Sequence, residues 1–177
     1  MNRLSKNATL LTLSFLFVVG MVFPDMASGK RAALGRSITP FVAKTLKGKT
    51  ISINQLKGRV VLIDFWATWC DPCREELPEL NALYQELQSQ GVEILGISVD
   101  RKRENVDEFI SKHSIRFPII HDQNKAISDD LRPRAMPTAF ILDQGGVVRH
   151  VHLGYKKSYL QLYRDEIKAL LQKGTKE

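Results

Sequence analysis

The sequence FWATWCDPCR, residues 65–74, contains both cysteines of this 177-residue chain. The apolar run immediately before it, residues 60–63, predicts a buried strand. Immediately after it, residues 75–87 carry leucines and a tyrosine at the spacing of one helix face. The two cysteines are therefore expected where a buried strand turns into the first turn of a helix.

Cys70 and Cys73 are separated by two residues, a spacing at which two thiols can close a small disulfide ring or open to a dithiol. The start of a helix supplies partial positive charge and free N–H groups, which stabilise a thiolate at Cys70. Cys73 lies one turn further into the helix and is expected to be less accessible. We therefore predict that Cys70 attacks a disulfide and that Cys73 resolves the resulting mixed disulfide.

A Cys-x-x-Cys pair is also often half of a structural zinc site, which needs four ligands. The chain has no second cysteine pair, and its four histidines do not show the spacing of a zinc finger. Redox chemistry is therefore the preferred interpretation of a pair that lies between a strand and a helix.

The first 29 residues predict export from the cytoplasm. Arg3 and Lys6 form a basic start, residues 10–23 are mainly apolar, and residues 27–29 offer the small side chains that a signal peptidase reads. The apolar run is short for a membrane span, which needs about 20 residues. A signal peptide is therefore expected, and an uncleaved anchor stays open because the cleavage site is not strongly marked. Either interpretation places the rest of the chain in the periplasm or another extracytoplasmic compartment, where disulfides persist.

Residues 30–37 are small and basic in composition and are interpreted as a linker to a single domain over residues 38–177. The net charge of +7 favours acidic partners or anionic membrane surfaces. The sequence shows no basic patch interleaved with aromatic residues, which argues against nucleic-acid binding. Membrane association is expected only if the N-terminal segment is retained.

Strand-like and helix-like segments alternate along this domain. A hairpin is expected from residues 38–43 and 51–53, joined by a turn over residues 46–50. Further strands are predicted over residues 60–63, 92–99, 117–120, 138–142 and 147–153, and helices over residues 75–87, 105–113, 125–131 and 158–172. The charge run at residues 100–104 is interpreted as a solvated loop. The order argues for an α/β fold with a mixed central β-sheet that helices cover on both faces.

Two motifs give the domain a more specific resemblance. Residues 66–78, WATWCDPCREELP, resemble the active-site segment of thioredoxin-like proteins, most closely the exported thiol–disulfide oxidoreductases of the TlpA/ResA type. Residues 136–138, MPT, lie about where those proteins place a cis-proline loop. The resemblance implies a thioredoxin fold with an N-terminal β-hairpin extension, and a cis bond before Pro137 next to Cys70. It also implies a substrate-binding surface made of Trp69, Met136, Pro137 and Thr138.

Two carboxylates complete the site that the resemblance implies. Asp64 stands where thioredoxins bury an aspartate behind the cysteine pair, although TlpA/ResA-type sequences more often carry asparagine there. Glu76 matches a glutamate that lies near the cysteines in that family. A buried carboxylate has a raised pKa and can take a proton from the resolving thiol. The alternative for Asp64 is a hydrogen-bonded core residue. The alternative for Glu76 is a first-turn glutamate whose negative charge interacts favourably with the helix dipole.

The resemblance implies an enzyme that exchanges disulfides with client proteins, such as those of cytochrome c maturation, and that needs no cofactor beyond its cysteines. A membrane thiol-reductant is the expected electron donor. A reducing direction is predicted, because Asp71 opposes a thiolate at Cys70 and no histidine lies between the cysteines.

Copper binding or delivery is the alternative function, with Cys70, Cys73 and His121 as ligands. The two-residue spacer argues against it, since exported copper chaperones of the resembled fold usually carry a longer spacer. A peroxidase is disfavoured as well, because the threonine and arginine arrangement around a lone peroxidatic cysteine is not apparent. No metal site is predicted elsewhere.

Other charged side chains allow weaker hypotheses. His150 and His152 alternate along one predicted strand and share a face, as metal ligands do, but on an edge strand they are expected to face solvent. Arg132 and Arg134 precede the expected cis-proline loop and are hypothesised to rim the cysteine pair. Two solvated arginines of little energetic weight are the alternative.

Overall fold

The computed structural model of the protein describes residues 32–174, so the predicted signal peptide or anchor lies outside the described residues. Two sheets are formed, and their strands are β1 (Val42–Lys44), β2 (Thr50–Ser52), β3 (Val60–Trp66), β4 (Val92–Ser98), β5 (Ile119–His121), β6 (Thr138–Leu142) and β7 (Val148–Leu153). The helices are α1 (Asp71–Leu87), α2 (Arg103–Lys112), α3 (Ala126–Leu131) and α4 (Tyr159–Gly174), with short 3-10 helices η1 (Ile53–Leu56) and η2 (Gln88–Gln90). None of the helices within residues 32–174 has both the length and the apolar character needed to cross a bilayer.

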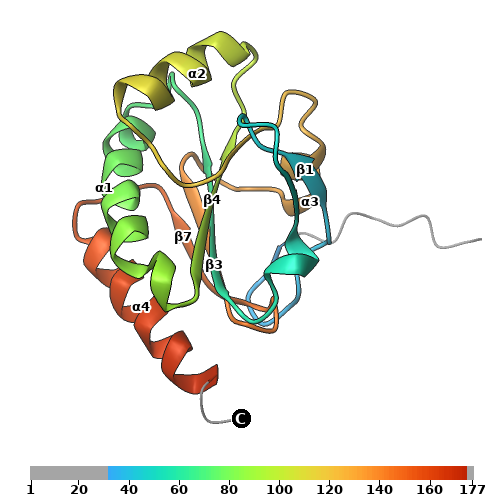
Figure 1. The fold of residues 1–177 in the computed structure, drawn as a ribbon, viewed down its shortest axis with the longest axis vertical. Helices are drawn as coiled ribbons and strands as arrows, with labels where there is room; N and C mark the ends of the chain where they lie inside the picture. The colour runs from blue at the N-terminus through green and yellow to red at the C-terminus, as the bar shows by residue number, and fades with distance from the viewer. Residues whose placement is uncertain (1–31, 175–177) are drawn as a thin grey trace, which may run out of the picture.

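The main sheet has the strand order β5-β4-β3-β6-β7 (Figure 1). β3 runs parallel to β4, and β4 runs parallel to β5. β6 and β7 are added in antiparallel orientation on the other side of β3. All seven residues of β3 are buried, which explains why this strand is continuously apolar except at Asp64. The predicted mixed sheet is confirmed.

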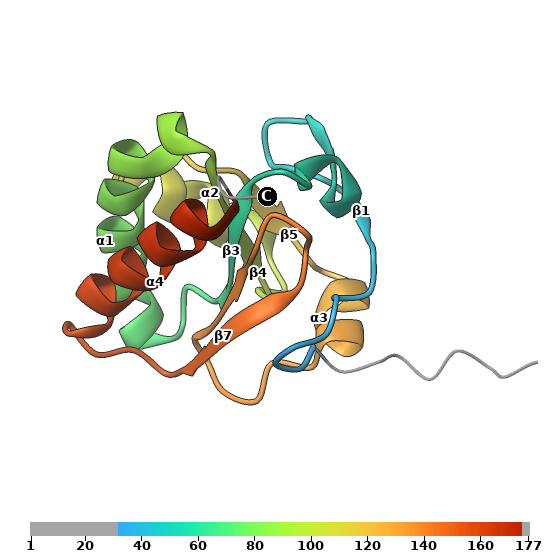
Figure 2. The same cartoon turned by 90° about the horizontal axis from the view of Figure 1, so that it is seen from below.

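Helices cover both faces of this sheet (Figure 2). On one face α1, α2 and α4 bury a leucine-rich core that includes Leu77, Phe109 and Ile167. On the other face α3, η1 and β2 bury a second core that includes Ile51, Ile53 and Ile127. The cysteine pair belongs to the first of these cores, so its chemistry takes place against the side of the sheet that carries α1 and α4.

The N-terminal hairpin is present, but it is shorter than the sequence predicted. β1 and β2 pair in antiparallel orientation over three residues each, with Ala43 opposite Ile51. Residues 38–41, expected to be part of the first strand, precede β1. The linker predicted over residues 30–37 is in contact with the domain from Ala32 onward, because the N–H of Ala32 donates to the carbonyl of Leu131 and Ser37 bridges to Val147.

The other element predictions are confirmed to within a few residues, and two differences matter for the site. α1 begins at Asp71 instead of residue 75, because Cys70 caps it and Pro72 occupies its first turn, where a missing N–H is tolerated. The interpretation of residues 100–104 as a solvated loop is wrong for Asp100, which is 1% exposed. The side chain of this residue is a hydrogen-bond acceptor next to the cysteine loop.

Candidate functional site

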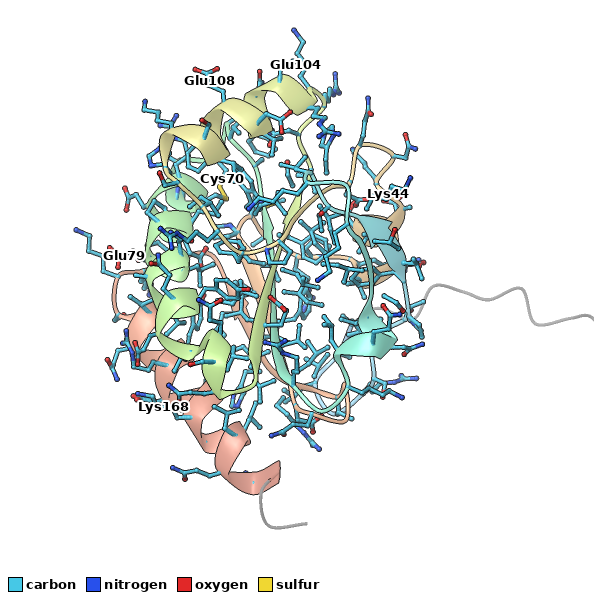
Figure 3. All side chains as sticks on the ribbon, in the orientation of Figure 1. Lys44, Cys70, Glu79, Glu104, Glu108 and Lys168 are labelled. Carbon is cyan, nitrogen blue, oxygen red and sulfur yellow. A yellow bond between two sulfur atoms is a disulfide. The ribbon has the colours of Figure 1, made fainter. Side chains whose placement is uncertain are left out.

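The cysteine pair lies at the first turn of α1, at the end of the molecule where α2 is found (Figure 3). Cys70 and Cys73 form a disulfide, with Cα atoms 5.3 Å apart. Cys70 is the N-cap residue of α1, and the N–H of Cys73 donates to Cys70 Sγ over 3.3 Å. A sulfur in this position faces the free N–H groups and the positive end of the helix dipole, which favour a thiolate once the disulfide opens.

The two sulfurs differ in access, as the sequence predicted. Cys70 is 7% exposed, whereas Cys73 is completely buried. Trp69, next to Cys70, is 66% exposed and so offers a large aromatic surface to solvent. A second protein can therefore contact Cys70 beside Trp69, whereas the buried sulfur of Cys73 is accessible only to groups of the same domain.

The loop before β6 supplies the opposite side of the site. The Met136–Pro137 peptide bond is cis, as the resemblance implied. Phe65 pairs with Thr138 in the β3–β6 ladder, which sets the residues before Thr138 level with the loop that leads to Cys70. The hydroxyl of Thr138 donates to the carbonyl of Ala135 over 2.7 Å and fixes this loop. Within residues 32–174, the backbone N–H and C=O of Met136 make no hydrogen bond.

Two carboxyl groups are buried behind the cysteines. Asp64 is completely buried on β3, and neither of its oxygens has a hydrogen-bond partner within residues 32–174. Glu76 is 1% exposed and lies three residues after Cys73, on the same face of α1. Its Oε1 accepts a hydrogen bond of 2.9 Å from the hydroxyl of Tyr163 on α4, and its Oε2 has no partner in the same range.

Burial decides the protonation of this carboxyl pair. Loss of hydration raises the pKa of Glu76 from 4.5 to about 8, although the Tyr163 hydroxyl lowers it. Burial also raises the pKa of Asp64 well above its usual value, and the nearby charge of Glu76 raises it further. Burial and the same two carboxyls raise the pKa of Tyr163, so this side chain stays a hydrogen-bond donor. The pair is therefore able to hold a proton at neutral pH within the core to which Cys73 belongs.

Two residues of the site were missed by sequence reasoning. Tyr163 was identified only as an apolar residue of the last helix, yet its hydroxyl is the donor to Glu76. A buried tyrosine usually needs a hydrogen-bond partner, and this requirement was the available signal. Asp100 was assigned to solvent, yet its carboxylate accepts from the N–H of Thr68 over 3.0 Å and from the hydroxyl of Thr68 over 2.6 Å. This contact ties the loop before Cys70 to the end of β4.

The prediction that the histidines of the last strand face solvent is wrong for His152, whose side chain is 11% exposed, whereas the side chain of His150 stays 34% exposed. His150 Nδ1 and His152 Nε2 lie 3.0 and 2.7 Å from the two carboxylate oxygens of Glu166 on α4. The ring of His152 also packs against Tyr163, with ring centroids 4.8 Å apart. The cluster thus attaches the edge strand to α4.

His121, the third ligand in the copper hypothesis, donates from Nε2 to the backbone carbonyl of Asp100 over 2.8 Å. Within residues 32–174, no group of three or more histidine, cysteine or acidic side chains is arranged to hold a metal ion. Nothing in this arrangement favours the copper hypothesis over disulfide exchange.

Comparisons with known proteins agree on one family. Residues 34–151 match the AhpC/TSA family. The chain is 30% identical over 158 residues to the thiol-disulfide oxidoreductase ResA of Oceanobacillus iheyensis, covering 86% of this chain and 82% of the relative. It is 32% identical over 142 residues to ResA of Bacillus cereus, covering 80% of this chain and 82% of the relative.

Solved structures confirm the fold. A putative thiol:disulfide interchange protein DsbE from Chlorobium tepidum superimposes with a TM-score of 0.74 at 25% identity, covering 78% of this chain and 98% of that one. StoA from Bacillus subtilis superimposes with a TM-score of 0.64 at 26% identity, covering 72% of this chain and 95% of that one. The predicted thioredoxin fold with an N-terminal hairpin is therefore confirmed. The chain belongs to the AhpC/TSA family, and within it to the thioredoxin-like thiol–disulfide oxidoreductases of the ResA type.

Proposed function

We propose that the protein reduces disulfides in client proteins outside the cytoplasm, with Cys70 as the attacking sulfur and Cys73 as the resolving sulfur. The observation that carries the proposal is the asymmetry of the pair. Cys70 keeps 7% of its surface exposed at the cap of α1, whereas Cys73 is completely buried and lies three residues before Glu76, whose pKa lies near 8. Cys70 is therefore proposed to attack the client disulfide, and Cys73 is proposed to resolve the mixed disulfide.

The reaction begins with the pair as a dithiol. The Cys70 thiolate attacks one sulfur of the client disulfide, so that a Cys70–client disulfide forms and the other client sulfur leaves as a thiolate and takes up a proton. Cys73 then loses its proton and attacks Cys70 Sγ. The Cys70–Cys73 disulfide closes, and the second client sulfur leaves and is protonated. Two electrons and two protons have then passed from the pair to the client, and an external dithiol must reduce the pair again.

Asp64 and Glu76 are proposed to handle the proton of Cys73. A thiol that is completely buried in apolar surroundings loses its proton reluctantly, so a base within the same pocket is needed for the second step. A carboxyl with a pKa near 8 is ionised in part of the population at neutral pH and is a strong enough base to accept that proton. Tyr163 holds Glu76 in place by its hydrogen bond.

The reducing direction rests on the same burial. A strong oxidant stabilises its reduced form as a thiolate, and the burial of Cys73 with two carboxyls opposes that stabilisation. The negative charge of Asp71 opposes a thiolate at Cys70 less than the sequence suggested, because Asp71 is ion-paired with Arg74 over 2.6 Å at the surface.

The client surface is proposed to consist of Trp69 and residues 136–138. The free backbone groups of Met136 can pair with an extended client segment in the manner of an added strand. Export by the N-terminal segment, resupply of electrons by a membrane thiol-reductant, and clients such as those of cytochrome c maturation complete the proposal. The relatives named ResA and the putative DsbE support the exchange chemistry itself.

Trapping of the mixed disulfide tests this assignment. A Cys73→Ser variant incubated with an oxidised peptide should accumulate a covalent adduct at Cys70, which a dithiol reductant releases. A Cys70→Ser variant is the matched control and should form none, since Cys73 is buried. Equal adduct formation by the two variants would contradict the assignment of roles.

A further inference from the structure

A groove beside the cysteine pair carries an excess of positive charge. It has a volume of about 1170 Å³ and opens between the loop after β4 and the segment around α3. Trp69 and Met136 line its side next to Cys70. Its cationic lining residues are Arg101, Lys102, Lys125 and Arg132. Arg134, grouped with Arg132 in the sequence hypothesis, is not among the lining residues.

These four cations face little opposing charge. Within residues 32–174 none of them forms an ion pair, whereas Arg74 and Arg103 at the same end of the molecule each pair with an aspartate. Asp129 is the one exposed acidic side chain in the lining. The carboxylate of Asp100 is buried and already accepts hydrogen bonds from Thr68 and Ser98. The positive potential of the groove is therefore left for a ligand.

The backbone holds two of the four cations at positions that are unfavourable for their residue types. Lys125 and Arg132 bracket α3 with φ angles of 56° and 51°, in the left-handed region that glycine or asparagine adopts at lower cost. Both side chains line the groove. Two long basic side chains thus stand where the local conformation favours smaller residues, and backbone strain of this kind is concentrated at functional surfaces.

We propose that this groove binds an acidic, extended segment of the client chain, next to the client cysteine that Cys70 attacks. The inference rests on the proposed function, because it makes the groove the continuation of the client surface at Trp69 and Met136. A polypeptide is the expected occupant, because Trp69 and Met136, which belong to the proposed client surface, line the same groove as the cations. Charge complementarity of this kind mainly raises the association rate and the selectivity among clients.

Binding of a peptide without cysteine tests the groove independently of redox activity. The probe is an extended peptide in which serine replaces the client cysteine and is followed by aspartates and glutamates. The matched probe carries asparagines and glutamines instead. Fluorescence of Trp69, the exposed one of the two tryptophans, reports binding to the oxidised protein. The acidic peptide should bind about tenfold more tightly at low salt, and the difference should vanish near 1 M salt.

An Arg101→Glu, Lys125→Glu variant should lose that tenfold preference. The control variant is Lys57→Glu, Lys173→Glu, which changes the net charge equally. Lys57 lies just before β3, and Lys173 lies in the last turn of α4. The C-terminal end of α4 lies at the opposite end of the domain from Cys70 (Figure 3). The control should keep the preference. Equal binding of both peptides to the unmodified protein would overturn the proposal, and so would an equal loss in the control.

Vesicles that contain phosphatidylglycerol supply a further arm. If the Arg101→Glu, Lys125→Glu variant no longer binds these vesicles but still binds the peptide, the groove serves a membrane and the proposal is wrong.

Reduction kinetics separate this proposal from the proposed function. Suppose that the unmodified protein reduces a small disulfide, but reduces acidic and neutral peptide disulfides with equal kcat/KM. The proposed function then stands, and the proposed role of the groove is wrong. If the protein reduces no disulfide, the proposed function is wrong. The fluorescence titration still tests whether the groove binds the acidic peptide.

Discussion

Replacing Glu76 by glutamine should flatten the dependence of stability on pH. In the folded protein the pKa of Glu76 lies at about 8, whereas in the unfolded chain it returns to about 4.5. Below pH 4.5 the carboxyl is protonated in both states, so its burial carries no ionisation penalty. As the pH rises through this range, the unfolded state loses the proton while the folded state keeps it. Stability therefore falls until the pH passes about 8.

The size of this effect follows from the two pKa values. Each pKa unit is worth about 1.4 kcal/mol, so Glu76 should remove about 5 kcal/mol of unfolding free energy between pH 4.5 and pH 9. Glutamine can still accept the Tyr163 hydrogen bond, but it buries an amide donor without a partner, at a cost of about 1–3 kcal/mol. The variant should be less stable than the unmodified protein at pH 5 and more stable at pH 9.

Urea unfolding of the oxidised protein, followed by circular dichroism at a series of pH values, measures this crossing. The control variant is Glu75→Gln, which changes the exposed neighbour of Glu76 and should leave the pH dependence unchanged. Asp64 keeps its own raised pKa in the variant, so a smaller slope of the same sign should remain. Parallel curves for Glu76→Gln and the unmodified protein would refute the assignment of a proton to Glu76.

Three further outcomes are expected. Tyr163→Phe should raise the pKa of Glu76 further, because the hydroxyl that lowers it is lost. The pH profile of disulfide exchange measures this shift, and a profile equal to that of the control variant Tyr159→Phe would contradict it. Asp64→Asn should slow release of the client from the mixed disulfide more than its formation, and single-turnover kinetics with equal effects on both steps would return Asp64 to a structural role. Equilibration with glutathione should give a reduction potential nearer to about −270 mV than to about −120 mV, and a value at the oxidising end would reverse the direction of electron flow.

Local sequence was sufficient for the cysteine pair and for most elements. A short apolar run, a Cys-x-x-Cys pair with an internal proline and a helical stripe of leucines each act over a few residues, and the structure forms them as strand, capped turn and helix. The difference in exposure between Cys70 and Cys73 was predictable for the same reason, since a position one turn into a helix is shielded by that helix.

Contacts between distant segments were decided by tertiary structure. Asp100 belongs to a run of charged residues, and its burial follows from Thr68, which lies 32 positions earlier in the chain. His150 and His152 occupy an edge strand, and they are drawn against Glu166 only because α4 packs there. Local patterns assign polar residues to solvent by default, so they do not reveal these pairings.

The position of the cysteine pair at the start of a helix could be predicted from neighbouring residues, because strand, turn and helix depend on short-range patterns. The surroundings of that pair depend on the packing of distant segments. It brought Tyr163 across 87 positions to Glu76, set two carboxyls in one pocket and gathered the cations of the groove from the loop after β4 and the ends of α3. A pKa and a surface potential depend on groups that are close in space, and the order of residues along the chain does not specify that proximity.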